Sequence, residues 1–427
     1  MRKIQKVAIL GASGNMGSHS GAVFAGADIQ CIFFARSMEK AKQGIESAMN
    51  AVRSSIIKDF IIPRTYDDLE KEIPECDWVF EALAEDIKIK REFFGRINGV
   101  RKPGTIVSSV SSGLSILDMV EETSEDFKAH ALGTHFYNPP TKLSANELIF
   151  HPANSEEFKQ FIKEFCEKTL HRINVETYDT PGFAGNRIGF QLLNSAAVEV
   201  EKSGAAKTEY LLGPYTGRAM APLATIDLVG LDVHKAITDN LKENTDDFLN
   251  NSFSMPDYMN KMIEQGMLGN KTPDKGGFFR GEQDPPLILN PKTLKHEANS
   301  AEHVDFVEQV KDLIHNGIYR RAVATLFSAQ GDDAGMVRRF ILNYISYSFS
   351  LIGIATPEED GIHGIDKVMA HGFSWMPPSG WIDLIGGPGQ TMKHLDQAGI
   401  PVPDQLKALP EEKICRVPDI SKYLVGR

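Results

Sequence analysis

The sequence predicts an N-terminal doubly wound α/β domain followed by one or more all-α domains. Up to about residue 180, short runs that are apolar at every position alternate with helical patterns. Such runs are typical of parallel strands covered on both faces, and strand–helix alternation is typical of a doubly wound sheet. After residues 179–182, Asp-Thr-Pro-Gly, strand-like runs almost vanish. A domain boundary is therefore expected near residue 180.

The first region reads as a series of strands joined by helices. The expected strands are residues 6–12, 29–35, 77–83, 105–110, 131–137 and 172–178, and the clearest expected helices are residues 14–27 and 37–56. In the second region, residues 186–204 and 303–330 have helical patterns. Residues 266–295 are rich in Gly and Pro and are expected to form a loop or linker.

Two stretches of the helical region recur in the same order. Residues 183–196 are weakly similar in sequence to residues 336–349. Residues 221–232 are more closely similar to residues 376–388. In both segments a proline-containing stretch leads into Ile-Asp-Leu-(Val/Ile)-Gly. Matched elements in one order favour duplication of a helical unit. The expected domains are therefore residues 1–180, 181–295 and 296–427, the third as a candidate repeat of the second.

The composition restricts the class of protein. The 427 residues are too many for one ordinary core, and 42% hydrophobic with 24% charged residues is ordinary for a globular protein. A net charge of −11 argues against binding of nucleic acid or anionic lipid by the chain as a whole. No apolar run reaches about 18 residues, so no membrane-spanning helix is expected. The first apolar run breaks at Gly11, too early for a secretory signal, so a cytoplasmic protein is expected.

The four cysteines are scattered and include no CxxC pair. Neither a zinc site nor a disulfide framework is therefore expected. Cys31 and Cys76 lie in apolar runs, where buried, unreactive thiols are the simpler interpretation.

A glycine-rich segment follows the first strand. Gly11, Gly14 and Gly17 form a GxxGxxG pattern between that strand and the next helix. Glycines here permit a tight turn and close approach to a pyrophosphate, which the N–H groups of Asn15, Met16 and Gly17 would bind at the start of the helix. The segment therefore predicts a Rossmann-type dinucleotide site; a glycine-rich turn without a ligand is the alternative.

The second strand lacks the acid that binds the ribose of NAD. That acid is expected about 20 residues after the glycine segment, but the strand ends in Ala35, Arg36 and Ser37. A guanidinium and a hydroxyl favour a 2′-phosphate through charge and bidentate hydrogen bonding. NADP is therefore slightly favoured; NAD binding without the carboxylate, with Arg36 solvated, stays open.

His135 and Glu147, twelve positions apart, are the candidate base and its orienting carboxylate. His135 ends a strand of the nucleotide domain, and ligands bind at the carboxyl ends of strands in such sheets. Glu147 is followed by three apolar residues, which favours burial, and a buried carboxylate needs a partner. A histidine held in this way suits proton abstraction from an alcohol. A core histidine and a solvated glutamate are the alternatives.

Four further stretches complete a resemblance to the L-3-hydroxyacyl-CoA dehydrogenase family, and to its 3-hydroxybutyryl-CoA dehydrogenase-like members. Residues 76–94 are similar to the strand and helix that carry the family's Glu-Asn-x-x-x-Lys, and residues 108–116 resemble its Ser-Asn-Thr-Ser-Ser-Leu loop. Residues 133–140 resemble its His-Phe-Phe-Asn-Pro, and residues 179–194 resemble its Asp-Thr-Pro-Gly-Phe-x-x-Asn-Arg. The resemblance runs from residue 4 to about 280 and faintly to about 400, where members with a duplicated helical domain are similar.

The resemblance implies an oxidoreductase that interconverts (3S)-hydroxyacyl-CoA and 3-ketoacyl-CoA with NAD or NADP, acting as a homodimer. It gives His135 the role of base and Glu147 that of its orienting group. It makes Ser111 a catalytic-site serine that contacts substrate and cofactor, and Asn186 the active-site asparagine of the second domain's first helix. It implies that Glu85, Lys90, Asn138 and Lys271 contact the cofactor. From the residues alone, Ser111 can be a turn serine and Asn186 a helix cap.

The sequence departs from the family pattern at three places. The glycine segment has one extra residue, the ribose acid is missing, and the serine loop reads Ser109-Val110 with an added Gly113. Two other functions are consistent with the residues: a dehydrogenase of a small hydroxy acid without CoA, and a dinucleotide-binding protein without catalysis.

Overall fold

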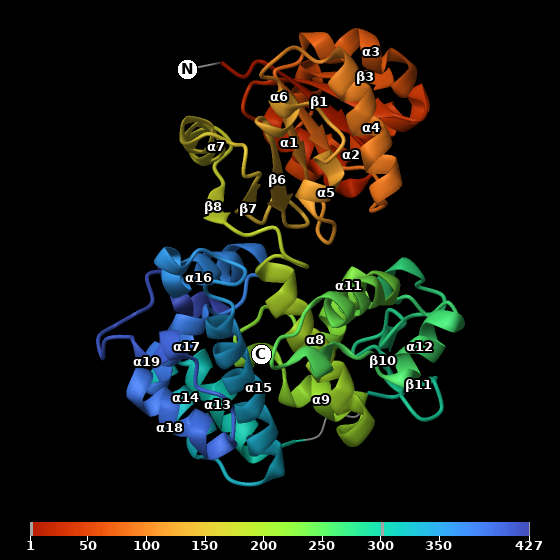
Figure 1. The fold of residues 1–427 in the computed structure, drawn as a ribbon. Helices are drawn as coiled ribbons and strands as arrows, with labels where there is room; N and C mark the ends of the chain where they lie inside the picture. The colour runs from red at the N-terminus through yellow and green to blue at the C-terminus, as the bar shows by residue number, and fades with distance from the viewer. Residues whose placement is uncertain (1–2, 300–302, 427) are drawn as a thin grey trace. The chain divides into compact units, whose positions relative to one another are not determined.

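The computed structural model describes residues 3–299 and 303–426, which form two compact units. Unit 1 contains residues up to 183 together with residues 355–357 and 371–373. Unit 2 contains the remaining described residues from 184 onward. The predicted α/β N-terminal part and helical C-terminal part are confirmed (Figure 1).

Unit 1 is built around one mixed sheet with the strand order β3-β2-β1-β4-β5-β6-β7-β8. Its strands are β1 (Lys6–Leu10), β2 (Gln30–Ala35), β3 (Ile61–Thr65), β4 (Trp78–Glu81), β5 (Ile106–Ser109), β6 (Ala131–Phe136), β7 (Ala145–Phe150) and β8 (Ile173–Glu176). Its helices are α1 (Asn15–Ala25), α2 (Met38–Val52), α3 (Leu69–Glu72), α4 (Ile87–Val100), α5 (Ile116–Val120), α6 (Glu125–Lys128) and α7 (Glu156–Lys168).

The sheet differs from the expected parallel sheet at β7. This strand runs antiparallel to β6 and parallel to β8, whereas β1 to β6 pair in parallel. Neither β3 nor β7 was predicted from the sequence. β3 contains Pro63, which cannot donate to a strand ladder, and it lies at the edge of the sheet, where such a residue is tolerated.

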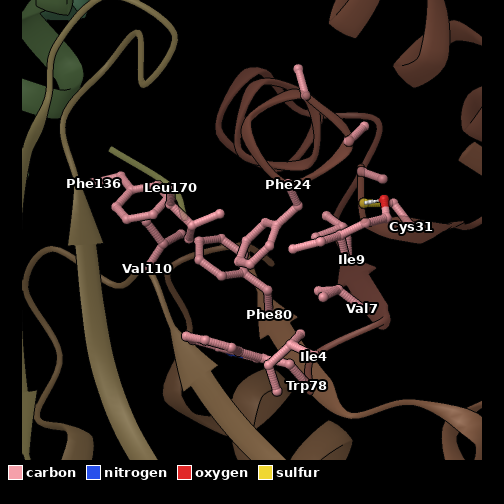
Figure 2. Close-up of a cluster of buried hydrophobic side chains, with 14 of the residues drawn as sticks. Ile4, Val7, Ile9, Phe24, Cys31, Trp78, Phe80, Val110, Phe136 and Leu170 are labelled. Carbon is pink, nitrogen blue, oxygen red and sulfur yellow. Dashed lines mark hydrogen bonds between the residues drawn. The ribbon is translucent and has the colours of Figure 1, made fainter. Parts of the chain in front are cut away.

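Alternate residues of each strand fill two separate cores, one on each face of the sheet. Val7 and Ile9 point to the face covered by α1, α2 and α7, whereas Ala8 and Leu10 point to the face covered by α3 to α6. Figure 2 shows the first core, where Phe24 of α1 reaches down between the side chains of the strands. Its ring makes edge contacts with Trp78 at 5.6 Å, and burial of one such side chain contributes about 1.5–3 kcal/mol.

Unit 2 is mainly helical. Its helices are α8 (Gly185–Ser203), α9 (Ala205–Leu211), α10 (Pro222–Val229), α11 (Leu231–Asn244), α12 (Asp257–Glu264), α13 (Asp305–His315), α14 (Tyr319–Ser328), α15 (Asp332–Ser350), most of α16 (Gly361–Gly372), α17 (Pro378–Ile385), α18 (Pro388–Ala398) and α19 (Asp404–Lys407). The helix α15 packs against α8, α14, α17, α18 and α19. Figure 1 shows α13 to α19 in teal to blue.

The prediction of a loop at residues 266–295 is wrong in part. The segment enters a small antiparallel sheet of β9 (Phe279–Arg280), β10 (Leu287–Asn290) and β11 (Lys295–Glu297). Its glycines adopt turns instead of linking domains: Gly276 has φ +75°, and the peptide of Gly277 packs against Asp227 so closely that an added Cβ would lie 2.1 Å from the carboxylate.

The two similar stretches of unit 2 have matching structures. α8 and α15 each span 19 residues, and α10 and α17 each span eight residues, begin at a proline and end before a glycine with positive φ. In α10 the Asp227 carboxylate accepts hydrogen bonds from the N–H groups of Phe278 and Phe279. In α17 the Asp383 carboxylate accepts them from Ile414 and Cys415.

All four cysteines are buried and unpaired. Burial raises the pKa of the Cys76 and Cys166 thiols to about 12, which keeps them protonated and unreactive. In the described part of the chain, no helix is long and apolar enough to cross a membrane.

Candidate active site

The carboxyl ends of β1, β4, β5 and β6 form one edge of the sheet in unit 1, and the candidate residues of this unit gather there. The chain leaves β1 through Gly11, which has φ +75° and packs against β4 so closely that an added Cβ would lie 2.1 Å from the Ala82 carbonyl oxygen. At Gly17 an added Cβ would lie 2.3 Å from the Gly11 carbonyl oxygen. Both glycines are therefore required by the fold itself.

Gly14 has a different role, because an added Cβ would meet only one atom, at 3.5 Å. It is the N-cap of α1, and neither a side-chain cap nor an acidic residue occurs in the first turn of this described helix. The helix begins at Asn15, followed by Met16 and Gly17, and no N-cap side chain bonds to its first N–H groups. That arrangement suits a phosphate group.

The residues directly before this helix line a cavity of about 410 Å³. Arg36 and Lys40 line it together with Gly11, Gly14 and Tyr66. The Tyr66 hydroxyl accepts a hydrogen bond of 3.0 Å from the Gly11 N–H and so ties the wall of the cavity to the glycine turn. A cavity of this size next to a helix start, with two cations in its lining, fits part of a dinucleotide.

The two polar residues that follow β2, Arg36 and Ser37, have different surroundings. Arg36 is exposed and lines the cavity, and Ala35, at the usual position of the ribose acid, is buried. The Ser37 side chain accepts a hydrogen bond from the Lys40 N–H and caps α2. Lys40 was not predicted as a site residue. Its position about one helical turn after the predicted Arg36 and Ser37 could have indicated it.

Lys90 and Glu81 form a buried ion pair beside this cavity, and the exposed Glu85 extends it. Lys90 is 1% exposed, and its ammonium donates to both carboxylate oxygens of Glu81 at 2.8 and 2.9 Å. Glu85 lies 3.4 Å from the same ammonium. Ser109, at the end of β5, donates its hydroxyl to Glu81. The sequence did not reveal Glu81, because a glutamate in an apolar strand looked like part of the core.

The Glu85 carboxylate also holds the loop after β5. It accepts hydrogen bonds from the Ser111 hydroxyl at 2.6 Å and from the N–H groups of Ser112 and Gly113 at 3.0 and 2.9 Å. Burial raises the pKa of Glu85, but the Lys90 ammonium and these hydrogen bonds outweigh it, so the pKa is lowered. Ser111 and Ser112 therefore differ: Ser111 binds Glu85 through its side-chain hydroxyl, whereas Ser112 binds it through its backbone N–H.

His135 and Glu147 face each other across the β6–β7 pair. Their Cα atoms are register partners, and the His135 Nδ1 lies 2.7 Å from the Glu147 Oε2. Glu147 is fully buried and His135 is 4% exposed. A carboxylate at Nδ1 keeps the proton there, so Nε2 is the nitrogen left to receive a substrate proton. The Phe183 ring covers the imidazole at 5.5 Å.

Tyr137 joins this pair and was not predicted as a site residue. Its hydroxyl donates to the Glu147 Oε2 at 2.6 Å, and its ring lies edge-on to the imidazole at 4.8 Å. Burial and the Glu147 carboxylate raise the pKa of Tyr137 well above its ordinary value, so it stays a donor. The signal in the sequence was its position two residues after His135 on one strand face.

The other predicted site residues are distributed more widely. Asn138 follows β6 and is exposed. In unit 2, Asn186 is the second residue of α8 and is buried; α8 has no side-chain cap, so the capping interpretation of Asn186 is wrong. Lys271 donates to the Asp232 carboxylate at 2.7 Å. Contacts of these residues with ligands stay a prediction.

Comparison with known proteins identifies the chain's relatives. Residues 6–180 match the family model described as the NAD binding domain of 3-hydroxyacyl-CoA dehydrogenase, and residues 182–278 match that of its C-terminal domain. A Deinococcus radiodurans protein named "Probable 3-hydroxyacyl-CoA dehydrogenase" is 32% identical, with 66% of this chain and 84% of that protein covered. The chain belongs to the 3-hydroxyacyl-CoA dehydrogenase family.

Two further matches extend over nearly the whole chain. A Bacillus subtilis protein, also named "Probable 3-hydroxyacyl-CoA dehydrogenase", is 31% identical over 96% of this chain, which spans only 54% of that protein. The crystal structure of 3-hydroxybutyryl-CoA dehydrogenase from Escherichia coli K12 has a TM-score of 0.68 at 17% identity, with 92% of this chain and 94% of that chain covered. The latter shows a shared fold. The family's dehydrogenase fold thus includes both units, and its N-terminal part is an NAD-binding domain.

Proposed function

We propose that this family member interconverts (3S)-hydroxyacyl-CoA and 3-ketoacyl-CoA by hydride exchange with a nicotinamide dinucleotide. The observation that carries the proposal is the buried pair of His135 and Glu147 at 2.7 Å, on the sheet edge that also holds the glycine turn. A base at the carboxyl ends of the strands lies where this type of sheet binds its ligands. The acyl-CoA substrate follows from the family and from the names of the relatives.

In this mechanism His135 moves one proton. When the alcohol is oxidised, the Nε2 of His135 takes the hydroxyl proton while the C3–H bond breaks and a C=O bond forms. A bound nicotinamide supplies the acceptor for the hydride, that is, for the hydrogen and both electrons of that bond. Glu147 stabilises the imidazolium that results and fixes the ring orientation. In the reverse direction the imidazolium returns the proton to the ketone oxygen.

The chain's other residues would hold the two ligands. The glycine turn and the first N–H groups of α1 suit the pyrophosphate. Ser111, in the loop after β5, is positioned by its hydrogen bond to Glu85. We propose that Ser111 contacts substrate and cofactor. The family resemblance implies that Asn186 contacts the substrate and that Asn138 and Lys271 contact the cofactor.

We propose NADP as the preferred cofactor. Arg36 and Lys40 both line the cavity at the end of β2, where Ala35 replaces the acid that would repel a 2′-phosphate. Arg36 has no ion-pair partner among residues 3–299 and 303–426, so its guanidinium remains available to a phosphate. Two cations at one phosphate favour NADP over NAD, because NAD offers only a neutral hydroxyl there.

The domain organisation is a proposal as well. We propose a nucleotide domain over residues 1–180, a helical domain over 181–295, and a repeat of it over 296–427. The paired carboxylates of Asp227 and Asp383, each bound to two successive N–H groups, support duplication. We also propose a homodimer in solution, which light scattering on the purified chain would test.

The test is a nicotinamide absorbance assay of the purified chain with acetoacetyl-CoA, run separately with NADH and NADPH. The proposal expects turnover of the thioester, with the higher kcat/KM for NADPH. Turnover of free acetoacetate at a kcat/KM equal to or above that of the thioester would instead make the chain a dehydrogenase of small hydroxy acids. Cofactor binding without turnover of either compound would reduce it to a dinucleotide-binding protein.

A further inference from the structure

Two donors share one oxygen of the Glu147 carboxylate. The Oε2 atom accepts from the His135 Nδ1 at 2.7 Å and from the Tyr137 hydroxyl at 2.6 Å. His135 lies on β6 and Tyr137 directly follows this strand, and β7 places Glu147 opposite His135 in the strand register. All three side chains are buried, so water does not relieve the competition for this oxygen.

The Tyr137 ring is held in place by a segment that returns to unit 1 from much later in the sequence. Gly372 packs on the ring so closely that an added Cβ would lie 2.9 Å from it, and Phe373 makes an edge contact at 5.5 Å. The Tyr137 hydroxyl therefore has little freedom to turn away from Glu147. A glycine is needed at position 372 because any larger residue would push this ring out of its site.

We propose that Tyr137 is a positioning residue of the dehydrogenase reaction, whose hydroxyl competes with the His135 imidazole for the Glu147 oxygen and so limits how strongly the imidazolium is stabilised. This rests on the proposed function, in which His135 exchanges the substrate proton. Part of the negative charge of Oε2 is already satisfied by the Tyr137 hydrogen bond. Tyr137 thereby makes the imidazolium a better acid for ketone reduction and the imidazole a weaker base for alcohol oxidation.

The titratable groups next to this oxygen include His135 on β6, Tyr137 directly after β6, Glu147 on β7 and His371 in the returning segment. β8 places the apolar Val175 opposite Glu147, and Phe183 covers the imidazole. The adjacent residue of β8, Glu176, alternates to the other sheet face, where it pairs with Lys163 at 2.7 Å.

The test is the pH dependence of kcat/KM in both directions for two substitutions at one position. Tyr137→Phe keeps the ring against Gly372 but removes the competing donor, so the imidazolium should be held more tightly. In the pH profiles of kcat/KM, the acidic limb of the oxidation and the basic limb of the reduction should both move to higher pH, by roughly half a unit to one unit. Tyr137→3-fluorotyrosine makes the hydroxyl a stronger donor and should move both limbs to lower pH.

Because the two Tyr137 substitutions are expected to shift the pH profiles in opposite directions, they distinguish this effect from structural damage. Tyr258→Phe is the matched control, because it removes a buried hydroxyl that donates to the Ala197 carbonyl at 2.8 Å in unit 2, and it should leave both limbs unchanged. Limbs that stay in place for both Tyr137 variants, or that move in the same direction for both, would overturn the proposal. Full activity of His135→Gln would instead overturn the proposed function, so the two failures are distinguishable.

Discussion

Replacing Glu147 with glutamine should remove most of the stabilisation of the imidazolium while the fold is kept. The amide oxygen can still accept from His135 and Tyr137, so the shape of the cluster survives but its negative charge does not. With Nδ1 and Oε2 at 2.7 Å, the centres of the two charges are about 4 Å apart. At an effective dielectric constant of about 20, their attraction is about 4 kcal/mol. Since about 1.4 kcal/mol corresponds to a factor of ten, kcat should fall on the order of 10³-fold.

The assay is steady-state oxidation of (3S)-hydroxybutyryl-CoA near neutral pH, the direction in which the imidazolium forms, together with a fluorescence titration of cofactor binding. Glu176→Gln on the neighbouring strand is the matched control: it loses a partly exposed ion pair with Lys163, and such pairs contribute under about 1 kcal/mol. It should keep activity within about twofold. A Glu147→Gln enzyme with kcat within about fivefold of the unmodified chain would refute the electrostatic reasoning, because the pair would then contribute little to the reaction.

Three further predictions concern other parts of the chain. Arg36→Ala should lower kcat/KM with NADPH by about 10- to 100-fold and change the value with NADH little, because only the phosphate loses a charge-assisted hydrogen bond; equal losses with both cofactors would contradict NADP preference. Lys90→Met should reduce the free energy of unfolding by about 3–5 kcal/mol in urea titrations, since it leaves the buried Glu81 uncompensated; Lys90→Met combined with Glu81→Leu should recover most of the loss. Burial lowers the pKa of His234 to about 3, below its ordinary value of 6.5, so only the unfolded chain takes up this proton as the pH falls from about 6.5 towards 3. That difference should reduce stability by about 1.4 kcal/mol per pH unit in this window, and His234→Gln should flatten the slope of unfolding free energy against pH.

The sequence predicted the parts of the site that local pattern encodes. The glycine segment, the end of β2 and His135 each follow a run of buried strand residues, and the rule that ligands bind at strand carboxyl ends placed them together. Glu147 was predicted from its apolar neighbours, but the strand that carries it was not. Its partner is β6, and antiparallel pairing of two strands depends on tertiary contacts that no short window of sequence contains.

The residues that were missed share a physical cause. Glu81 and Tyr137 lie in apolar strands, where one polar residue looks like a tolerated exception until its buried partner is known. Lys40 is an exposed helix residue whose role depends on the cavity beside it. The small sheet of β9 to β11 escaped because its glycines, at turns such as Gly276, were interpreted as a flexible linker.

The central claim is that His135 exchanges the substrate proton. It is tested most directly by a single-turnover measurement on His135→Gln with saturating cofactor and acetoacetyl-CoA, in which the nicotinamide absorbance reports the hydride step. The account predicts a rate about 10²- to 10⁴-fold lower than that of the unmodified chain, with cofactor affinity unchanged within about threefold. A hydride step at nearly the original rate would contradict it.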